Sequence, residues 1–345
     1  MWVTVFFFCS LVPWGQAIPD ATKTERAENE FVARSVPGPI QDLDKITEVV
    51  LSPDGQWLAT GSGEKQGMIQ RWNLRTLREE KPRFTHDRAV QSIAISSQGR
   101  LLAGSSPFGR IGIWEWKSGK RLGVLDGPLS SVNALAFHPT NEKLLASGND
   151  RDITLWDLNR FASKTILKGH SGNVYAVAFS PDGRFLVSGG KDRMIVVWDV
   201  KDGKEVARLR GHTDRVKALA FCLKSGLLAS ASEDGTVKLW DFAQKKEVRS
   251  LVAQREGVFS VAFSRDGKWL AAGGLDWDHG SGEVRVWEAA TGKLLTRFSA
   301  HDPGAAASIG FTADDKFLIT GGWDKIPQER RTVKLWKLER KSSRP

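Results

Sequence analysis

The stretch VYAVAFSPDGRFLVSGGKDRMIVVWD, from Val174 to Asp199, carries the pattern that decides the fold. It begins with a short run of strand-forming residues, and a second such run follows the tetrapeptide SPDG at 180–183. Proline, aspartate and glycine in that order supply the backbone angles of a tight turn. A third apolar run, MIVVW, ends at Trp198. The stretch therefore predicts three short strands in succession, the first two joined as a hairpin.

The same pattern recurs along the chain at a nearly constant spacing. A polar turn and a further short strand, such as EVARLR at 205–210, follow the tryptophan, so that each unit holds four strands. The intervals between successive tryptophans in this role are 42, 42, 42, 42, 47 and 49 residues. These tryptophans are Trp72, Trp114, Trp156, Trp198, Trp240, Trp287 and Trp336. The repeated role accounts for a chain with 14 Trp and a single Tyr.

A unit of about 42 residues with four short strands resembles the WD40 repeat. Gly169-His170 with Trp198-Asp199, and Gly211-His212 with Trp240-Asp241, carry both characteristic dipeptides of that family. The resemblance covers residues 38–340. It implies an all-β fold, a seven-bladed β-propeller made of four-stranded antiparallel blades. It also implies a non-enzymatic scaffold that binds a protein or peptide, although fold alone does not identify the partner.

The two ends of the repeat region suggest how the ring closes. The chain ends soon after the strand that holds Trp336, before a fourth strand can form. The segment RSVPGPIQDLD, Arg34 to Asp44, precedes the first complete hairpin and has no partner of its own. We expect this segment to supply the outer strand of the seventh blade, because the edge of that sheet would otherwise be exposed.

The N-terminus resembles a secretory signal peptide. Val3 to Val12 is an apolar run too short to span a bilayer, and Gly15-Gln16-Ala17 offers small residues for cleavage after Ala17. No Lys or Arg precedes the apolar run, which departs from the usual pattern. We expect an exported protein with no transmembrane segment in the mature chain; the alternative is a misassigned start codon and a cytoplasmic protein. The expected division is a signal peptide at 1–17, a linker at 18–37, the propeller at 38–340 and a basic tail at 341–345.

Charge and cysteine content narrow the function. The formal net charge is +10, and the cations are spread along the chain. Without a long basic run or interleaved aromatic residues, this pattern argues against nucleic acid as the partner. An adaptor for an acidic partner remains an alternative to a solvated basic surface. Cleavage after Ala17 would leave one cysteine, Cys222, which cannot form an intrachain disulfide.

His, Ser or Thr, Asp and Trp recur at matched offsets. In WD40 proteins such a set forms a hydrogen-bonded tetrad within a blade, and a buried indole N–H, which can only donate, needs the hydroxyl as its acceptor. A catalytic triad would occur once and face a pocket, so we expect no catalytic residue, cofactor or metal. The other units are degraded; the second keeps His86 but has Phe108 in the place of Asp. The predicted tetrads are His170, Ser188, Asp192, Trp198; His212, Ser230, Asp234, Trp240; and His301, Thr320, Asp324, Trp336.

Two regions are candidate partner-binding sites. The loop between the tetrad Asp and the Trp is lengthened in units six and seven, where Trp287 rather than Trp277 holds the strand position. Exposed Trp and Arg are frequent in binding hot spots, although neutral variation in loop length is the alternative. The loop candidates are Trp277, Asp278, His279, Trp323, Lys325, Arg330 and Arg331. Asp276, Asp278 and His279 are too few for a metal site and match no known ligand spacing.

The second region is the wall of the central channel. One residue near the start of each inner strand should point into the channel, and those of units four, five and six are Tyr175, Lys217 and Phe259. Together they could form an aromatic and basic patch, for which ordinary channel lining is the alternative. The corresponding residues of the other units are Thr47, Gln91, Asn133 and Ala307. These offer no pairing of nucleophile and base, which argues against an exported enzyme or cofactor-binding propeller.

Overall fold

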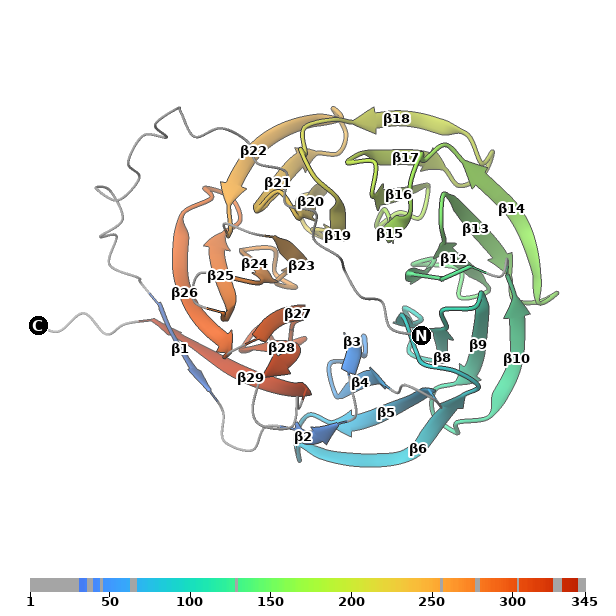
Figure 1. The fold of residues 1–345 in the computed structure, drawn as a ribbon, viewed down its shortest axis with the longest axis horizontal. Coiled ribbons are helices and arrows are strands. Elements are labelled where there is room, and N and C mark those ends of the chain that lie inside the picture. The colour runs from blue at the N-terminus through green and yellow to red at the C-terminus, as the bar shows by residue number, and fades with distance from the viewer. Residues whose placement is uncertain are drawn as a thin grey trace, which may run out of the picture.

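The computed structural model describes residues 31–35, 40–43, 46–62, 67–127, 130–254, 257–276, 280–302, 304–324 and 331–340. Of residues 40–43, 323, 324, 331 and 340 it describes the backbone alone. The strands of this part form seven antiparallel sheets, arranged as blades around a central channel (Figure 1). An all-β fold with four-stranded blades in a ring is confirmed.

Each blade has one strand beside the channel and three further strands that follow outward. The strands of blades one to four are β3 (Ile46–Leu51), β4 (Trp57–Ser62), β5 (Gly67–Asn73), β6 (Arg78–His86); β7 (Ile93–Ile95), β8 (Leu101–Ser105), β9 (Arg110–Glu115), β10 (Arg121–Asp126); β11 (Ala134–Phe137), β12 (Leu144–Gly148), β13 (Asp152–Asp157), β14 (Ala162–Lys168); and β15 (Val174–Phe179), β16 (Phe185–Gly190), β17 (Ile195–Asp199), β18 (Glu205–Leu209). Those of blades five to seven are β19 (Val216–Phe221), β20 (Leu227–Ser232), β21 (Thr236–Asp241), β22 (Lys246–Val252); β23 (Val258–Phe263), β24 (Trp269–Gly274), β25 (Gly282–Glu288), β26 (Leu294–His301); and β27 (Gly304–Phe311), β28 (Phe317–Asp324), β29 (Arg331–Arg340), with β1 (Phe31–Ser35) and β2 (Ile40–Leu43) on β29.

The tight turn of the opening stretch forms as its residues predict. The Ser180 hydroxyl donates to Asp182 at 2.6 Å and accepts the backbone N–H of Phe185 at 3.0 Å. The Asp182 carboxylate also accepts the N–H of Arg184 at 3.0 Å. Gly183 takes a φ of 72°, which costs glycine little and other residues more. The polar groups of the turn are thus hydrogen-bonded within the turn itself.

The hydrophobic core lies in the seams between blades. The inner strands of neighbouring blades contact one another around the whole ring, including β27 with β3, which joins blade seven to blade one. The second strand of each blade is largely buried, as in the pattern of β16. One apolar cluster joins Leu155 of blade three to Leu186 and Trp198 of blade four. Each blade is therefore stabilised by its neighbours rather than by a core of its own.

The N-terminal part of the chain closes the ring, as the edge argument predicts. β1 pairs antiparallel with β29, with Phe31 opposite Arg340 and Ser35 opposite Trp336, and β2 continues along the same strand. The closing strand begins earlier than the segment expected from the sequence, at Phe31, within the range expected to be a linker. The physical reason is that the buried Phe31 ring packs edge-to-face on Trp269 of blade six, at a centroid distance of 5.6 Å.

The predicted signal peptide at 1–17 and the basic tail at 341–345 lie outside the described residues. The part of the chain that is described holds no helix with the length and apolar character needed to cross a membrane. Cys222 is buried.

Candidate partner-binding surface

The meander of each blade divides the turns between two faces of the ring. We call the face that carries Gly169-His170 and Gly211-His212, together with the loops between the second and third strands, the GH face. The opposite face carries the turns at 52–55 and 180–183, and we call it the SPDG face. Because successive turns alternate, an insertion between the second and third strands always extends the GH face.

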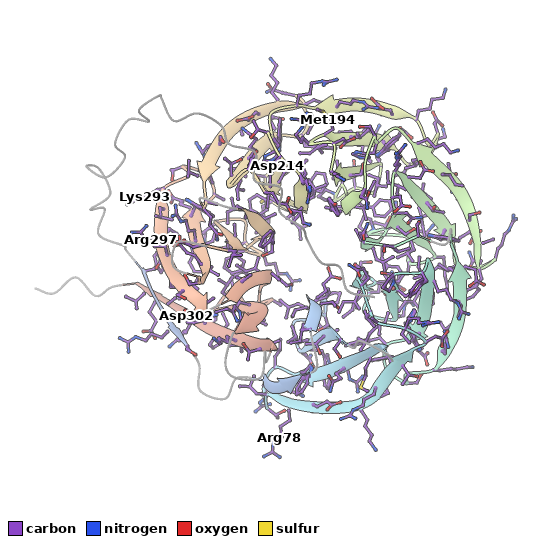
Figure 2. The ribbon with its side chains drawn as sticks, viewed as in Figure 1. Arg78, Met194, Asp214, Lys293, Arg297 and Asp302 are labelled. Atoms are coloured by element: carbon purple, nitrogen blue, oxygen red, sulfur yellow. The ribbon has the colours of Figure 1, made fainter. Side chains whose placement is uncertain are left out.

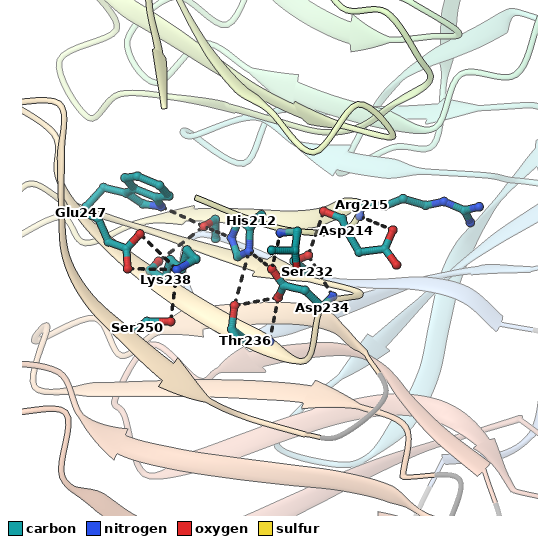
Figure 3. Close-up of polar contacts among 12 residues, drawn as sticks. His212, Asp214, Arg215, Ser232, Asp234, Thr236, Lys238, Glu247 and Ser250 are labelled. Carbon is teal, nitrogen blue, oxygen red and sulfur yellow. Dashed lines mark hydrogen bonds and ion pairs between the residues drawn. The ribbon is translucent and has the colours of Figure 1, made fainter. Parts of the chain in front are cut away.

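Blade five shows the tetrad geometry (Figure 3). His212 Nδ1 lies 2.7 Å from the Asp234 carboxylate, and His212 Nε2 lies 2.7 Å from Ser230 Oγ. The indole N–H of Trp240 donates to the same hydroxyl at 2.9 Å. Burial opposes ionisation of Asp234, but hydrogen bonds from His212 and Thr236 outweigh it and hold the pKa of this carboxyl well below its usual range. These polar groups are therefore occupied inside the blade.

Blade four has the same network. His170 lies between Asp192, at 2.9 Å, and Ser188, at 2.7 Å, and Trp198 donates to Ser188 at 2.9 Å. Burial is again the largest influence on the pKa of Asp192, and the hydrogen bonds from His170 and the Ser171 backbone outweigh it, so that this pKa is also lowered.

For blade seven the structure describes the inner part of the network. His301 Nε2 lies 3.0 Å from Thr320 Oγ1, and the Trp336 indole donates to that oxygen at 2.9 Å. The backbone of Asp324 lies in β28, and its side chain lies outside the described part of the structure.

The degraded blades retain the indole contact where a hydroxyl remains. Trp72 donates to Thr60 at 3.0 Å in blade one, and Trp156 donates to Ser147 at 2.8 Å in blade three. In blade two the strand register places Gly104 where the hydroxyl belongs. The buried Nε2 of His86 has no hydrogen-bond partner in the described structure. This loss was missed in the sequence, where the missing hydroxyl could have been found by counting back from Trp114.

The channel opens on the GH face as a cavity of about 560 Å³. It is lined by one residue from each blade at the predicted position: Thr47, Gln91, Asn133, Tyr175, Lys217, Phe259 and Ala307. The Lys217 ammonium lies 4.1 Å from the centroid of the Tyr175 ring, within range of a cation–π contact. Burial lowers the pKa of Lys217, although Glu233 opposes this shift, and burial raises the pKa of Tyr175. A cation and an aromatic ring thus lie together in a poorly solvated position.

Further charged residues lie between Lys217 and the part of the cavity that Phe259 lines. Glu233 Oε1 lies 3.6 Å from Lys217 Nζ, and Glu233 Oε2 lies 3.4 Å from the Arg215 guanidinium. Gly257 adjoins both Glu233 and the Phe259 ring, since a Cβ built on it would lie 3.6 Å from the former's Cα and 3.4 Å from the latter. Tyr175, Lys217 and Phe259 thus line the same cavity, and we call these three residues the channel patch.

On the opposite wall of the channel, two of the polar side chains are already hydrogen-bonded. Thr47 donates to the carbonyl of Gly61 at 3.1 Å, and Asn133 donates to that of Val174 at 3.2 Å. Next to Thr47, the carboxylate of Glu48 accepts the N–H of Ile93 from blade two. Sequence reasoning missed Glu48, although it is the only large residue at its position around the ring. The equivalent residues are Ser92, Ala134, Ala176, Ala218, Ser260 and Ser308.

The necks of the two lengthened loops lie side by side on the GH face. Asp276 and Ser281 form a two-hydrogen-bond bridge, which closes the blade-six loop. Gly304 donates its N–H to the carbonyl of Gly280 at 2.7 Å, and Gly304 also pairs with Asp324 at the base of the blade-seven loop. Trp287 lies in β25 opposite Leu270, the position that Trp198 holds opposite Leu186.

The loop candidates themselves are only partly within the described structure. The backbones of Trp323 and Arg331 pair at the end of the β28–β29 hairpin. Trp277, Asp278, His279, Lys325 and Arg330 lie outside the described residues.

Blade two adds an exposed aromatic residue to the GH face. Phe108, which replaces the tetrad Asp, is 54% exposed, and the Arg88 guanidinium lies 5.2 Å from its ring centroid. Arg110, the first residue of β9, forms ion pairs with Asp87 and Asp126. Sequence reasoning noted Phe108 only as a degraded tetrad position.

Cations also occupy the perimeter. Figure 2 shows Arg78, Lys293 and Arg297 on the outer turns and strands, away from the channel. Within the described ranges, no group of three or more His, Cys, Asp or Glu side chains is arranged to hold a metal ion.

Comparison with known proteins shows which families share these features. Residues 131–343, more than half of the chain, match the family described as the IFT122 first β-propeller, and residues 35–73 match the WD domain, G-beta repeat. The chain is 26% identical over 112 residues to the WD repeat-containing protein 91 homolog of Dictyostelium discoideum, a match that covers 32% of this chain and 15% of that protein.

Two further relatives show similar limits. The chain is 30% identical over 105 residues to the WD repeat-containing protein SL1-17 of Schistosoma mansoni, which covers 30% of this chain and 34% of the relative. It is 28% identical over 115 residues to the WD repeat-containing protein WDS homolog of Arabidopsis thaliana, a match that covers 32% of this chain and 22% of that protein. The matches thus span a minor part of the length of these relatives.

Proposed function

Since the chain belongs to the WD40-repeat β-propellers, in the family of the IFT122 first β-propeller, we propose that it is a scaffold that binds a protein or peptide on its GH face. Proteins with such propellers act in general as non-catalytic scaffolds. The hydrogen bonds of the tetrads support a structural role for these residues, because in blades four and five each His and Ser is hydrogen-bonded inside its own blade.

The channel patch is the observation that carries the proposal. Tyr175, Lys217 and Phe259 come from three successive blades and line one cavity. Aromatic side chains bury a large area at low entropic cost, and a half-buried cation gains most from a partner group that replaces its lost hydration. Tyr175 and Lys217 are held together before any partner arrives, which lowers the cost of ordering them on binding.

The exposed Phe108 and the paired necks of the blade-six and blade-seven loops support a wider contact on the same face. We propose that Trp277, Asp278, His279, Trp323, Lys325, Arg330 and Arg331 extend it. Loops mounted on a rigid ring vary without disturbing the core, so they suit the recognition of a particular partner.

Site-specific photocrosslinking in the native cells tests the proposal. A photoreactive residue at Gln91, which is exposed at the channel mouth, should capture a defined protein, and one at Val206 on the perimeter should not. The double substitution Tyr175→Ala with Lys217→Ala should abolish capture from Gln91. If capture from Gln91 and from Val206 is the same, or if the double substitution leaves it unchanged, the channel patch is not the binding site.

We also propose that the protein is exported, on the strength of the apolar run at Val3–Val12 and the small residues before Ala17. N-terminal sequencing of the native protein should find a chain that begins at Ile18. An intact Met1 would contradict export and favour the cytoplasmic alternative.

A further inference from the structure

A second cavity, of about 400 Å³, lies at the SPDG face, where the inner strands end. Its apolar lining comes from four blades. Leu51 belongs to blade one, Phe263 to blade six and Phe311 to blade seven, and Phe221 and Leu223 belong to blade five. Leu223 is 67% exposed, an unusual degree for a leucine beside other apolar side chains. We call these five residues the apolar pocket.

Three of the four hydroxyl groups that line this cavity are already occupied, and the fourth, that of Ser97, comes from blade two. Ser264 donates to Asp266 at 2.8 Å, and Thr312 donates to Asp314 at 2.7 Å, each within its own turn. Ser52 does the same in blade one. These hydroxyls therefore offer a ligand little free hydrogen-bonding capacity, and the pocket favours an apolar group.

The charge at the edge of the pocket is positive on the side of blades five and six. Arg265 lines the cavity, and Lys224 lies against the neighbouring turn, with its Cβ 3.2 Å from the place a Cβ on Gly267 would take. No described carboxylate forms an ion pair with either cation. Asp315 lies close by, but its two oxygens accept the backbone N–H groups of Arg265 and Asp266 at 2.7 and 2.9 Å.

The remaining acids near the pocket are also engaged. Asp266 pairs with Lys268 at 2.9 Å, and Asp314 pairs with Lys316 at 3.5 Å. On the other side of the same face, contacts between blades tie the turns together. Glu142 of blade three accepts hydrogen bonds from Ser96 and Gln98 of blade two. An apolar opening with unpaired cations is thus found beside blades five and six.

We infer that the apolar pocket is a second docking site, for a short acidic segment of a partner protein. A bulky apolar side chain of that segment enters the pocket, and neighbouring carboxylates pair with Arg265 and Lys224. The volume suits one or two side chains rather than a folded surface, and the charge selects an acidic segment over a basic one. This site is on the face opposite the channel patch, so it does not depend on the function proposed above. A ring with both sites could hold two partners at once.

Peptide binding to the purified full chain tests the inference. The probe is a fluorescein-labelled peptide EDLFDE, read by fluorescence anisotropy, with KKLFKK and EDSSDE as matched peptides. EDLFDE should bind saturably, and the other two should bind at least about tenfold more weakly, because one lacks the charge and the other the apolar side chains. Raising the salt concentration should weaken EDLFDE binding.

Variants locate the site. Arg265→Glu and Leu223→Ser should each weaken EDLFDE binding by about tenfold, while Lys201→Glu on a distant turn of the SPDG face and Lys217→Ala in the channel patch should not. Leu223 and Arg265 are exposed, so melting curves of their variants should match that of the parent chain. The inference is wrong if EDLFDE does not saturate at about 1 mM, if KKLFKK binds equally well, or if Lys201→Glu weakens binding as much as Arg265→Glu.

Discussion

The carboxylate of Glu48 accepts a hydrogen bond from the backbone N–H of Ile93, at 2.6 Å, across the seam between blades one and two. Glu48 lies beside the channel at a position where the other six blades carry Ser or Ala. Burial raises the pKa of Glu48 to about 7, and the hydrogen bonds from Ile93 and Ser92 only partly offset this shift.

Glu48 should make the stability of the protein depend on pH. Because its pKa is near 7 when folded and 4.5 when exposed, the folded state binds more protons between these values. The stabilising contribution of protonated Glu48 to the free energy of unfolding is therefore complete below about pH 4.5, and it is lost as the pH rises through 7. Between pH 5 and pH 8 the free energy of unfolding of the parent chain should fall by on the order of 2 kcal/mol because of Glu48. Glu48→Gln should abolish this decrease, measured by denaturant unfolding.

Glu142 provides the control for that experiment. Burial raises its pKa, but Ser96 and Arg100 outweigh this effect, so the pKa of Glu142 is lowered. Its contribution is present above the unfolded pKa and is lost only in acid. Glu142→Gln should leave the pH dependence of the free energy of unfolding between pH 5 and pH 8 unchanged. Parallel curves for the parent chain and Glu48→Gln would contradict the assignment to Glu48.

The tetrad of blade five should contribute strongly to stability. Asp234→Ala would leave the buried His212 without its carboxylate partner, and this should lower the free energy of unfolding by about 2–3 kcal/mol. The measurement is thermal or denaturant unfolding. Asp202→Ala, on an exposed turn of blade four, is the matched control. Equal melting of the two variants would show that the network adds little.

Placing a serine at Gly104, to restore the missing hydroxyl of blade two, should not stabilise the protein. A Cβ at Gly104 would lie 2.6 Å from Cδ1 of Ile69 in blade one, so Gly104→Ser should destabilise the protein by about 1–3 kcal/mol. Ile69→Val removes that methyl group, and the double variant should lose less than the sum of the two single changes. Additive losses in this double-mutant cycle would mean that Ile69 is not the obstacle.

The N-terminal strand should hold the ring closed. Phe31→Ala removes a buried ring from its contact with Trp269 and should cost about 3 kcal/mol. It should also speed hydrogen exchange in β29, since β1 covers that edge. Val32 is the next residue on the strand and is 37% exposed, so Val32→Ala should have a much smaller effect. Unchanged exchange in β29 would indicate that the ring closes without Phe31.

Much of the fold followed from local patterns. The spacing of Trp72 to Trp336 predicted the number of blades, and the alternation before Trp287 located β25 despite the misleading Trp277-Asp278 dipeptide. Tight turns and apolar periodicity are settled by residues near one another in the chain. The limit of this reasoning appears at blade two, where the pattern alone suggested a tetrad that had lost only its Asp. Ile69 from another blade occupies the space that a Cβ at Gly104 would need.

The sequence by itself determined the repeat, the strands and the tetrads of blades four and five, because these interactions occur within one unit of about 42 residues. Only the tertiary structure decided what happens between blades. It placed Glu48 against Ile93, Phe31 against Trp269, and Leu51 in one pocket with Phe311. Such contacts join residues far apart in the chain, and closing the ring fixes their distances. The physical reason is that the strands of a blade pair mainly with one another, whereas the apolar faces and the channel surface of a blade are completed only by its neighbours.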